Sequence, residues 1–510
     1  CSAKFKVRGR FWRAGECAML VVVGVLVLLF AFYWLHDHNY NGYWPSVAAK
    51  SSEIVYRALG QVAVLLMSLL LFPAARSSGM LAISSVFGVS WETSIQYHRW
   101  LGVGFLLAVF AHMVAVWVWQ AQEGEFSFFS VPLITSTTKD NFTVPMTTLV
   151  SWFTFITMGG LALNRVRRKH FELFFYAHHV TYCVLIPTVL WHAAASWQFL
   201  MPGLTAWFLD RCVRAFRSAR AVKVLNCRAE TCGAAGDITV IEAVRPFDYF
   251  AGHYAFLNIT ELSLFQWHPF TISSVAGSKV ISFHIKSMGP GTWTGRLFDL
   301  VKAHQEAVSK GQEQFCAPPI TLSLDGPTGQ PIDFSKFSTV ILVAGGIGIT
   351  PCKSIFETFR SARAESLGPT LKRVHLMWAG RDMNLFTSIM GHSLRDLPQG
   401  PESAPPIFSA NVFVDNPAAL EVPPPLERAS SSSSSSSEDP VNLSRISRLG
   451  RMNFPAEFDS IARGFLAEGE EPDAQRKTLV FVCGPPGITA ICEGLCNERG
   501  WTFHTETFML

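Results

Sequence analysis

Long apolar runs are missing from the second half of the chain: from about residue 222 onward, no stretch is long enough to cross a bilayer. Charge is also scarce, since Asp, Glu, Lys and Arg make up 16% of the residues and the formal net charge is +4. So small a charge gives no basis for a nucleic-acid-binding surface. The sequence therefore predicts a membrane-embedded first half and a second half that folds in water.

Six apolar runs occupy the first half, and most approach the length that crosses about 30 Å of hydrocarbon. They cover residues 17–36, 54–75, 95–119, 146–163, 171–192 and 197–210. We therefore expect a six-span α-helical domain over residues 1–215. The first run is interpreted as a membrane anchor and not as a signal peptide, because its apolar core is long and no small-residue cleavage site follows it.

Basic residues predict the orientation in the membrane. KFKVRGRFWR precedes the first run, NRVRRKHF joins the fourth and fifth, and RCVRAFRSAR follows the sixth, whereas residues 120–145 contain one Lys and no Arg. The N-terminus and the second half are thus expected in the cytoplasm. The sequon Asn141-Phe142-Thr143 would face outward. None of the 11 cysteines lies in the predicted external loops, 37–53 and 120–145, so no disulfide framework is expected.

Histidines interrupt two of the apolar runs at matched spacing. His98 and His112 lie in the third run, and His178 and His192 lie in the fifth, 14 residues apart in each case. Over 14 residues an α-helix rises about 21 Å and ends about 40° short of four full turns. Each helix then presents two imidazoles on nearly one face, and two such helices side by side form two bis-histidine haem sites.

Two other roles are open to these histidines. Structural hydrogen bonds between helices, or a proton path, are the alternatives to haem, whereas copper and zinc usually take three or four converging ligands. His179, which directly follows His178, is a second candidate for the same ligand position. The spacing to His192 favours His178, but a kink at Pro187 would bring His179 to the same face, so both remain candidates for the inner haem.

Residues 222–333 read as short strands separated by turns, which predicts a small antiparallel β-barrel. The segment HPFT, residues 268–271, is expected at a sheet edge because proline cannot donate a ladder hydrogen bond. Further along, HIKSMGPGTWT leads into an apolar-periodic helix. The N-terminus of that helix is suited to binding a phosphate.

Residues 334–510 alternate between strands and helices, which predicts an α/β domain. In VILVAGGIGITP a buried strand leads into a Gly-rich turn and a helix, Arg381 follows a second strand, and Cys483 ends a third before GPPG. Ligands of open α/β sheets bind beyond such strand ends. Residues 397–475 contain a Pro-rich segment and the run SSSSSSSSEDP, so we expect a disordered insertion there, either a spacer or a regulatory loop.

In this order the motifs resemble the ferric reductase and NADPH oxidase superfamily of six-span membrane flavocytochromes. The resemblance covers nearly the whole chain and rests on the paired histidines within YHRWLG and FELFFYAHH, and on HPFT, HIK, GTWT, DGPTG, GGIGITP and CGPPG. It implies a multi-domain fold: a helical bundle with two b-type haems, a β-barrel that binds FAD, and an α/β domain of the ferredoxin-NADP reductase type that binds NADPH.

The resemblance also implies roles for single residues. The inner haem would be held by His98 and His178, and the outer haem by His112 and His192. The isoalloxazine of FAD would be lined by His268, Pro269, Phe270 and Thr271, with His284, Lys286, Trp293 and Thr294 near the ribityl and phosphate portions. The NADPH pyrophosphate would lie at Gly345, Gly346, Gly348, Thr350 and Pro351, the nicotinamide at Cys483, Gly484 and Pro485, and the 2′-phosphate at Arg381.

Members of the superfamily differ in the external electron acceptor that they reduce. Its reductases reduce ferric chelates or cupric ions before uptake by a separate transporter, and its oxidases reduce dioxygen to superoxide. Oxidases characteristically end on an aromatic residue, whereas this sequence reads FHTETFML with two residues after Phe508. We therefore expect a plasma-membrane ferric-chelate reductase, with an NADPH oxidase as the alternative. A partner protein without its own chemistry is disfavoured, because the flavin and nicotinamide motifs are intact.

Overall fold

The computed structural model describes most of the chain, in segments. The described residues are 4–7, 10–40, 47–76, 87, 91–124, 145–193, 196–311, 317–329, 331–361, 371–391, 408–415, 447–467 and 477–506. The Asn141 sequon, the serine run and Phe508 lie outside them. The chain divides into two compact units, Cys1–Ala215 and Phe216–Leu510.

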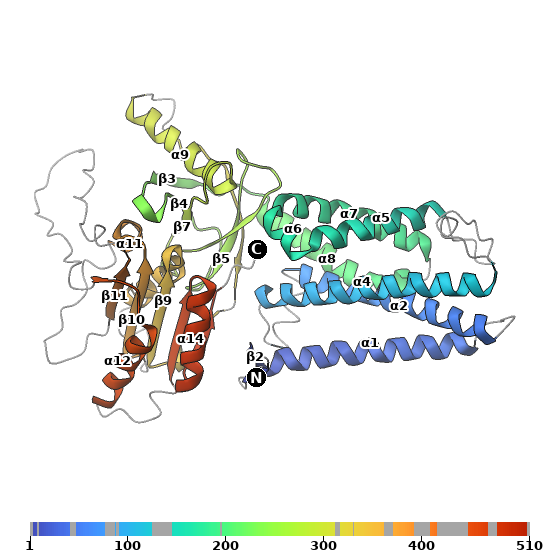
Figure 1. The fold of residues 1–510 in the computed structure, drawn as a ribbon. Coiled ribbons are helices and arrows are strands. Elements are labelled where there is room, and N and C mark those ends of the chain that lie inside the picture. The colour runs from blue at the N-terminus through green and yellow to red at the C-terminus, as the bar shows by residue number, and fades with distance from the viewer. Residues whose placement is uncertain are drawn as a thin grey trace, which may run out of the picture. The chain divides into compact units, whose positions relative to one another are not determined.

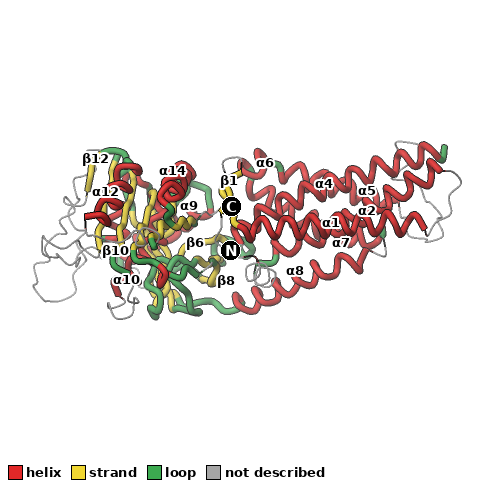
Figure 2. Tube along the Cα trace, turned by 90° about the horizontal axis from the view of Figure 1, so that it is seen from below, coloured by secondary structure: helices red, strands yellow, loops and turns green. Residues whose placement is uncertain are grey.

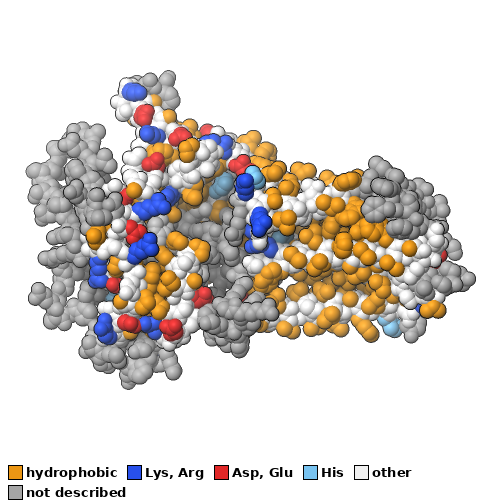
Figure 3. Space-filling model, in the orientation of Figure 1, with side chains coloured by type: hydrophobic (Ala, Val, Ile, Leu, Met, Phe, Trp, Pro, Cys, Tyr) orange, Lys and Arg blue, Asp and Glu red, His pale blue; other side chains and the backbone are white. Residues whose placement is uncertain are grey.

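The first unit is a bundle of helices preceded by a short antiparallel hairpin (Figure 1). The hairpin strands are β1 (Lys4–Val7) and β2 (Arg10–Arg13), and the helices are α1 (Ala14–Tyr40), α2 (Val47–Ala74), α4 (Trp91–Gln122), α5 (Pro145–Ala162), α6 (Asn164–Lys169), α7 (Phe171–His192) and α8 (Trp197–Ser218). Hydrophobic side chains cover the visible face of the bundle (Figure 3). Among them Leu28 and Phe32 are 71% and 69% exposed, as expected of surfaces that face lipid.

The number of membrane spans differs from the six that were predicted. Among the described residues, four helices are long and apolar enough to cross a bilayer, namely α1, α2, α4 and α7. In α5 the apolar part whose side chains are described, Val150–Ala162, is shorter than these. In α8 the second half carries Asp210, Arg211 and Arg214, which lowers its hydropathy. The prediction of six spans is therefore not confirmed by length and composition.

The second unit begins with two three-stranded antiparallel sheets, ordered β3-β4-β7 and β6-β5-β8. Their strands are β3 (Val224–Glu230), β4 (Ile238–Val244), β5 (Tyr254–Ile259), β6 (His268–Thr271), β7 (Val280–Lys286) and β8 (Leu322–Thr328), and α9 (Trp293–Ser309) packs on them. Alternate apolar side chains of the strands, such as Ile241, Phe283 and Leu257, form one shared core. The strand β6 lies at a sheet edge, as its proline predicted.

The α/β part of this unit contains a parallel six-stranded sheet with the order β12-β11-β10-β9-β13-β14. Figure 2 draws the strands in yellow. The strands are β9 (Thr339–Gly345), β10 (Arg373–Gly380), β11 (Phe408–Val414), β12 (Ser447–Leu449), β13 (Thr478–Cys483) and β14 (Thr502–Thr505). Helices α10 (Ile349–Ser361) and α11 (Met383–Met390) pack on one face, and α12 (Phe454–Ala467) and α14 (Pro486–Arg499) on the other. Side chains of β9 point alternately into these two cores, because the strand is covered on both faces.

The disordered insertion predicted over residues 397–475 needs correction. Its described residues include β11, β12 and α12, and Phe458 of α12 is fully buried. The segment was judged by its average composition, which the prolines and serines dominate. The short apolar strand FSANVFV and the amphipathic helix FPAEFDSIARGFLA are masked by that average, although each can bury one face against the sheet.

Candidate functional site

The four predicted haem ligands form two facing pairs between α4 and α7. The ring centroids of His98 and His178 are 6.2 Å apart, and those of His112 and His192 are 6.4 Å apart. The ring planes are inclined at 75° and 83°. Because an imidazole nitrogen binds a first-row metal at about 2 Å, two rings on opposite sides of one iron have centroids about 6 Å apart. Both pairs therefore fit a bis-histidine haem.

Backbone carbonyls of α2 orient the two imidazoles of α4. The Nδ1 of His98 lies 2.9 Å from the Leu70 carbonyl oxygen, and the Nδ1 of His112 lies 2.7 Å from that of Tyr56. A neutral imidazole donates through Nδ1 in this contact and keeps the lone pair on Nε2 for a metal. A Cβ on Gly60 would lie 3.1 Å from the His112 ring, so this glycine lets the ring pack on the α2 backbone.

The structure brings His178, and not His179, to His98. The Nδ1 of His179 donates to the Phe175 carbonyl oxygen of its own helix at 2.7 Å, and its ring packs 4.3 Å from the Phe175 ring. The Nδ1 of His178 is buried and has no hydrogen-bond partner among the described residues. The geometry thus favours His178 as the ligand of the inner pair.

The HPFT strand and α9 meet through Trp293. The ring centroid of Trp293 lies 4.6 Å from that of His268 and 5.7 Å from that of Phe270. The rings of Trp293 and Phe270 are stacked. The indole is 4% exposed, and its Nε1 has no hydrogen-bond partner among the described residues. A buried donor without an acceptor fits a cofactor that supplies one. The remaining HPFT residues, Pro269 and Thr271, pair with Phe256 and Tyr254 of β5.

The start of α9 is preceded by a glycine loop. Gly289 and Gly291 have φ values of +105° and +76°, which side chains rarely adopt. A Cβ on Gly295 would lie 2.1 Å from the Gly289 carbonyl oxygen, so the loop lies directly on the helix. Thr292 caps the helix by accepting from Gly295, and the Thr294 hydroxyl accepts from the Met288 N–H at 2.9 Å. Because the Gly295 and Arg296 N–H groups are bonded to Thr292, the amides at the start of α9 that suit a phosphate are those of Trp293 and Thr294.

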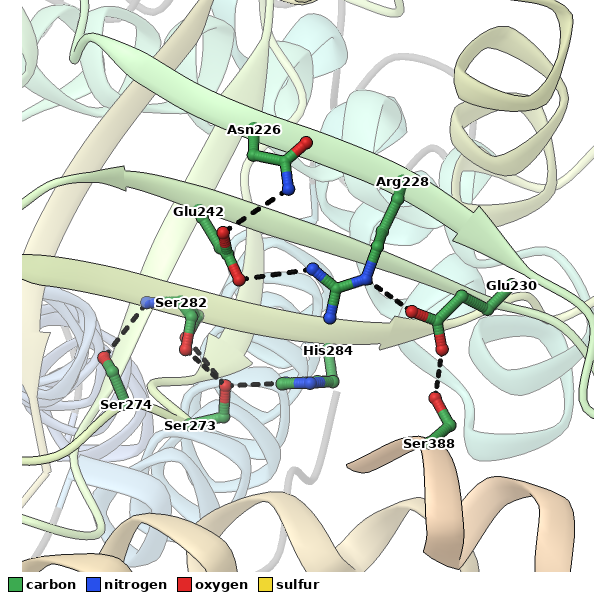
Figure 4. A network of polar contacts seen from close by, with 9 residues as sticks. All are labelled: Asn226, Arg228, Glu230, Glu242, Ser273, Ser274, Ser282, His284 and Ser388. Carbon is green, nitrogen blue, oxygen red and sulfur yellow. Dashed lines mark hydrogen bonds and ion pairs between the residues drawn. The ribbon is translucent and has the colours of Figure 1, made fainter. Parts of the chain in front are cut away.

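His284 lies inside a polar network of the barrel (Figure 4). Its Nδ1 contacts the Ser273 hydroxyl at 2.7 Å, and that hydroxyl donates to the Ser282 carbonyl at 2.9 Å. Burial, assisted by the positive charges of Lys353 and Arg228, lowers the pKa of His284 to about 3. His284 is therefore neutral and donates to Ser273, a partner that the sequence analysis missed. Lys286 lies further along β7 and packs its side chain over the backbone of Gly236.

Acidification is expected to destabilise the second unit through His284. The pKa of this histidine is about 3 when folded, against about 6.5 in an unfolded chain. Between these values only the unfolded state binds the proton, so the free energy of unfolding falls as pH drops through this range. The expected loss from pH 7 to pH 5 is about 2 kcal/mol. His284→Gln should remove that part of the pH dependence in thermal unfolding, and an unchanged dependence would contradict the assignment.

The two glycine turns of the α/β domain lie against each other. A Cβ on Gly348 would lie 2.2 Å from the Cys483 carbonyl oxygen, and one on Gly345 would lie 2.7 Å from the Pro485 ring. Gly484 also closely approaches the backbone of Gly345. The turns follow β9 and β13, which are neighbours in the sheet although three strands separate them in the chain. This is the point where the strand order reverses, the usual binding crevice of such sheets.

Side chains next to these turns fix them in place. The Nε1 of Trp378 donates to the Gly346 carbonyl at 2.9 Å, and the Thr350 hydroxyl donates to the Ile347 carbonyl at 3.1 Å. Pro351 lies in the first turn of α10, where its missing N–H costs no helical bond. Trp378 was missed by the sequence analysis, since an indole inside a buried strand reads as core.

Cys483 is a buried thiol at the end of β13. Burial, together with the nearby carboxylate of Glu506, raises the pKa of Cys483 well above its ordinary value. The side chain is therefore a neutral thiol at physiological pH and can serve as a contact surface, but it is not a nucleophile. Glu506 follows β14, and its N–H donates to the Val482 carbonyl at 3.1 Å. No motif pointed to Glu506, because only the sheet brings it to Cys483.

Arg381 directly follows β10, on the carboxyl edge of the sheet, and is exposed. The next residue, Asp382, is buried and caps α11 by accepting from the Asn384 N–H at 3.1 Å. Its second carboxylate oxygen accepts from the Ala235 N–H of the barrel at 2.9 Å. Asp382 therefore fixes the backbone beside Arg381 and joins the α/β domain to the barrel.

The chain thus combines a helical unit that carries paired histidines with an antiparallel barrel and a parallel α/β sheet, which defines a multi-domain membrane protein. Three family models match in succession: "Ferric reductase like transmembrane component" at residues 59–189, "FAD-binding domain" at 222–332 and "Ferric reductase NAD binding domain" at 337–497. The chain belongs to the ferric reductase and NADPH oxidase superfamily. The predicted fold class is confirmed in these terms, as an N-terminal helical transmembrane domain followed by FAD-binding and NAD-binding domains.

Relatives come from both branches of the superfamily. The chain is 29% identical over 353 residues to "Ferric reduction oxidase 8, mitochondrial" of Arabidopsis thaliana, an alignment that covers 65% of this chain and 43% of the relative. It is 27% identical over 411 residues to a superoxide-generating NADPH oxidase heavy chain of Dictyostelium discoideum, covering 75% and 77%. The chain thus spans less than half of the first relative and about three quarters of the second.

Among solved structures, a ferredoxin NADP+ reductase from Neisseria gonorrhoeae with bound FAD and NADP is similar to this chain. The identity is 13% and the TM-score is 0.36, with 56% of this chain and 97% of that one covered.

Proposed function

We propose that the chain carries electrons from NADPH across the membrane to an external ferric chelate, and that cupric ions are a second substrate. The observation that carries the proposal is the stack of two histidine pairs in a membrane bundle, on one chain with an FAD-binding and an NAD-binding domain. NADPH gives up two electrons, so each molecule would reduce two ferric ions and release one proton.

Separate groups of residues would bind NADPH, FAD and the haems. The glycine turns at Gly348 and Cys483 would bind the pyrophosphate and nicotinamide of NADPH, and Trp293 and the HPFT strand would hold FAD. Two b-type haems would be bound by His98 with His178 and by His112 with His192. Bound haem and flavin supply the redox chemistry. Because two histidines would hold each haem, the chelate would be reduced without binding the haem iron itself.

Two features of the comparisons bear on the acceptor. The models that match the membrane part and the nucleotide-binding part both carry the name ferric reductase, which supports the reductase branch. The Dictyostelium oxidase heavy chain aligns over more of its own length than ferric reduction oxidase 8 does, which favours dioxygen as the second candidate acceptor. We place the chain in the plasma membrane, with its nucleotide-binding unit in the cytoplasm and a separate iron transporter as its partner.

The acceptor is tested on the purified chain supplied with NADPH, FAD and haem. Ferric-chelate reduction and superoxide-dismutase-sensitive reduction of cytochrome c are measured in parallel. We expect two ferrous ions for each NADPH oxidised, and little superoxide while chelate is present. Superoxide as the dominant product in the presence of chelate would reject the reductase assignment and establish the oxidase.

Arg381 is expected to select NADPH over NADH, because it is exposed and follows β10 at the carboxyl edge of the sheet, where a guanidinium could bind the 2′-phosphate. Arg381→Ser should raise the KM for NADPH about 10- to 100-fold, the loss of one charge-assisted contact. The KM for NADH should stay nearly unchanged. Equal losses with the two nucleotides would contradict the assigned role.

A further inference from the structure

The turn between β5 and β6 exposes two large apolar side chains of the barrel. Leu264 is 67% exposed and Phe265 is 73% exposed, and neither joins the barrel core. We call these two residues the apolar tip. Adjacent large apolar side chains on a water-facing domain commonly mark a contact surface.

The tip is held by a network of hydrogen bonds within its own turn. The side-chain amide of Asn258 donates to the carbonyl oxygens of Ser263 and Gln266, both at 2.8 Å, and Asn258 is 5% exposed. The N–H groups of Phe265 and Gln266 lie 3.3 Å from the Ser263 hydroxyl, which accepts from both. Both ends of the turn are thus fastened to β5, so the exposure of the tip is a built feature of the fold.

The tip lies beside the point where the chain passes from α8 into the barrel. The N–H of Val222 donates to the Leu322 carbonyl at 2.7 Å. Thr321 directly precedes Leu322, and its N–H donates at 2.9 Å to the carboxylate of Glu261, a residue of the turn that carries the tip. Val222 and the turn that carries the tip are therefore bonded to two consecutive residues, and they share one end of the barrel.

Helix α8 connects that end of the barrel directly to the membrane part of the chain. Arg211 of α8 donates to the carbonyl of Ala74, the last residue of the candidate span in α2, at 3.4 Å. The helix ends at Ser218, and the four residues from there to Val222 reach at most about 14 Å. The tether is also basic, since Arg220 and Lys223 are exposed.

We propose that the apolar tip inserts into the lipid headgroup region at the end of α8. Leu264 and Phe265 would enter the interface, and Arg220 and Lys223 would attract anionic headgroups. A modest apolar insertion combined with basic charge is sufficient for stable contact with a bilayer. The contact would hold the barrel against the membrane surface, and it does not depend on which external acceptor the protein reduces.

The test is photo-cross-linking of the full chain in nanodiscs of phosphatidylcholine and phosphatidylserine. Phe265 is replaced by p-benzoylphenylalanine, and lipid adducts are counted by mass spectrometry after irradiation. Met288 is the matched control, because it is also 73% exposed. Met288 follows β7, and Lys286 at the end of β7 pairs with Ile238 at the start of β4. Val224, next to the tether, pairs with Ala243 near the end of β4. Met288 therefore lies at the opposite end of this sheet from the tether.

We expect about tenfold more lipid adduct at position 265 than at position 288. Equal yields at the two positions, or cross-links from position 265 to peptide alone, would overturn the proposal, the latter in favour of a protein contact. Flavin absorbance of each variant reports whether the barrel is folded. If the Phe265 variant does not bind FAD, Leu264→p-benzoylphenylalanine provides the same measurement one residue away.

Discussion

Replacing His178 by leucine is expected to remove the inner haem and to stop electron transfer to the external acceptor. The ring of His178 faces that of His98 at 6.2 Å, and among the described residues the neighbouring imidazole of His179 is turned away from this pair. Reduced six-coordinate haem should fall by half in the visible spectrum. The rate of ferric-chelate reduction should fall on the order of 100-fold or more, since the path is interrupted at its first metal.

His179→Leu is the matched control for this experiment. It makes the same change one residue away, at an imidazole that is hydrogen-bonded to its own helix at the Phe175 carbonyl. We expect both haems to be retained and the rate of chelate reduction to change less than about threefold, because the variant loses one local hydrogen bond. Loss of haem in the His179 variant, with haem retained in the His178 variant, would reverse the assignment.

Gly348→Ala is expected to disable the nucleotide-binding turns. The added Cβ would lie 2.2 Å from the Cys483 carbonyl oxygen and 2.7 Å from its carbon, and both are backbone atoms of the neighbouring turn. The two strand ends must separate, which costs about 1–3 kcal/mol as overpacking. NADPH binding should weaken by about 100-fold because both faces of the crevice shift. Flavin content should be unchanged, and a titration of flavin reduction with NADPH measures the effect.

Gly494→Ala tests whether a methyl group in this domain is harmful in itself. Gly494 lies in α14, and nothing among the described residues lies within 4 Å of the Cβ that would be added there. The variant should bind NADPH normally and gain about 0.5–1 kcal/mol in stability, because alanine favours a helix over glycine. Normal NADPH binding in the Gly348 variant would show that the turns do not need their close contact.

The spacing of the histidines was readable from the sequence because a helix has a fixed rotation per residue. Fourteen residues return a side chain to nearly the same face, so the pairs were predictable before any packing was known. The choice between His178 and His179 was not closed in the same way, because Pro187 allowed either rotation. The structure distinguishes them through contacts that no local pattern contains: His178 faces the ring of His98, and His179 turns back to Phe175.

Averages over a segment were less informative than periodic patterns. The run of serines and prolines led to a predicted disordered insertion, although a strand and a helix within it bury one face each. Six apolar runs suggested six spans, but among the described residues the charges in the second half of α8 leave that helix too polar to be a candidate membrane span. In both cases a property of a few residues was hidden by the composition around them.

The sequence by itself determined the order of the domains, the family and the residue types at each site, because these follow from local periodicity and from short motifs. Only the tertiary structure decided which of these residues meet. Gly348 and Cys483 lie 135 residues apart in the chain, and the reversal of strand order between β9 and β13 brings their turns into contact. Glu506 and Trp378 reach the same region for that reason. Such contacts depend on the pairing of distant strands, which a single sequence does not encode in any local pattern.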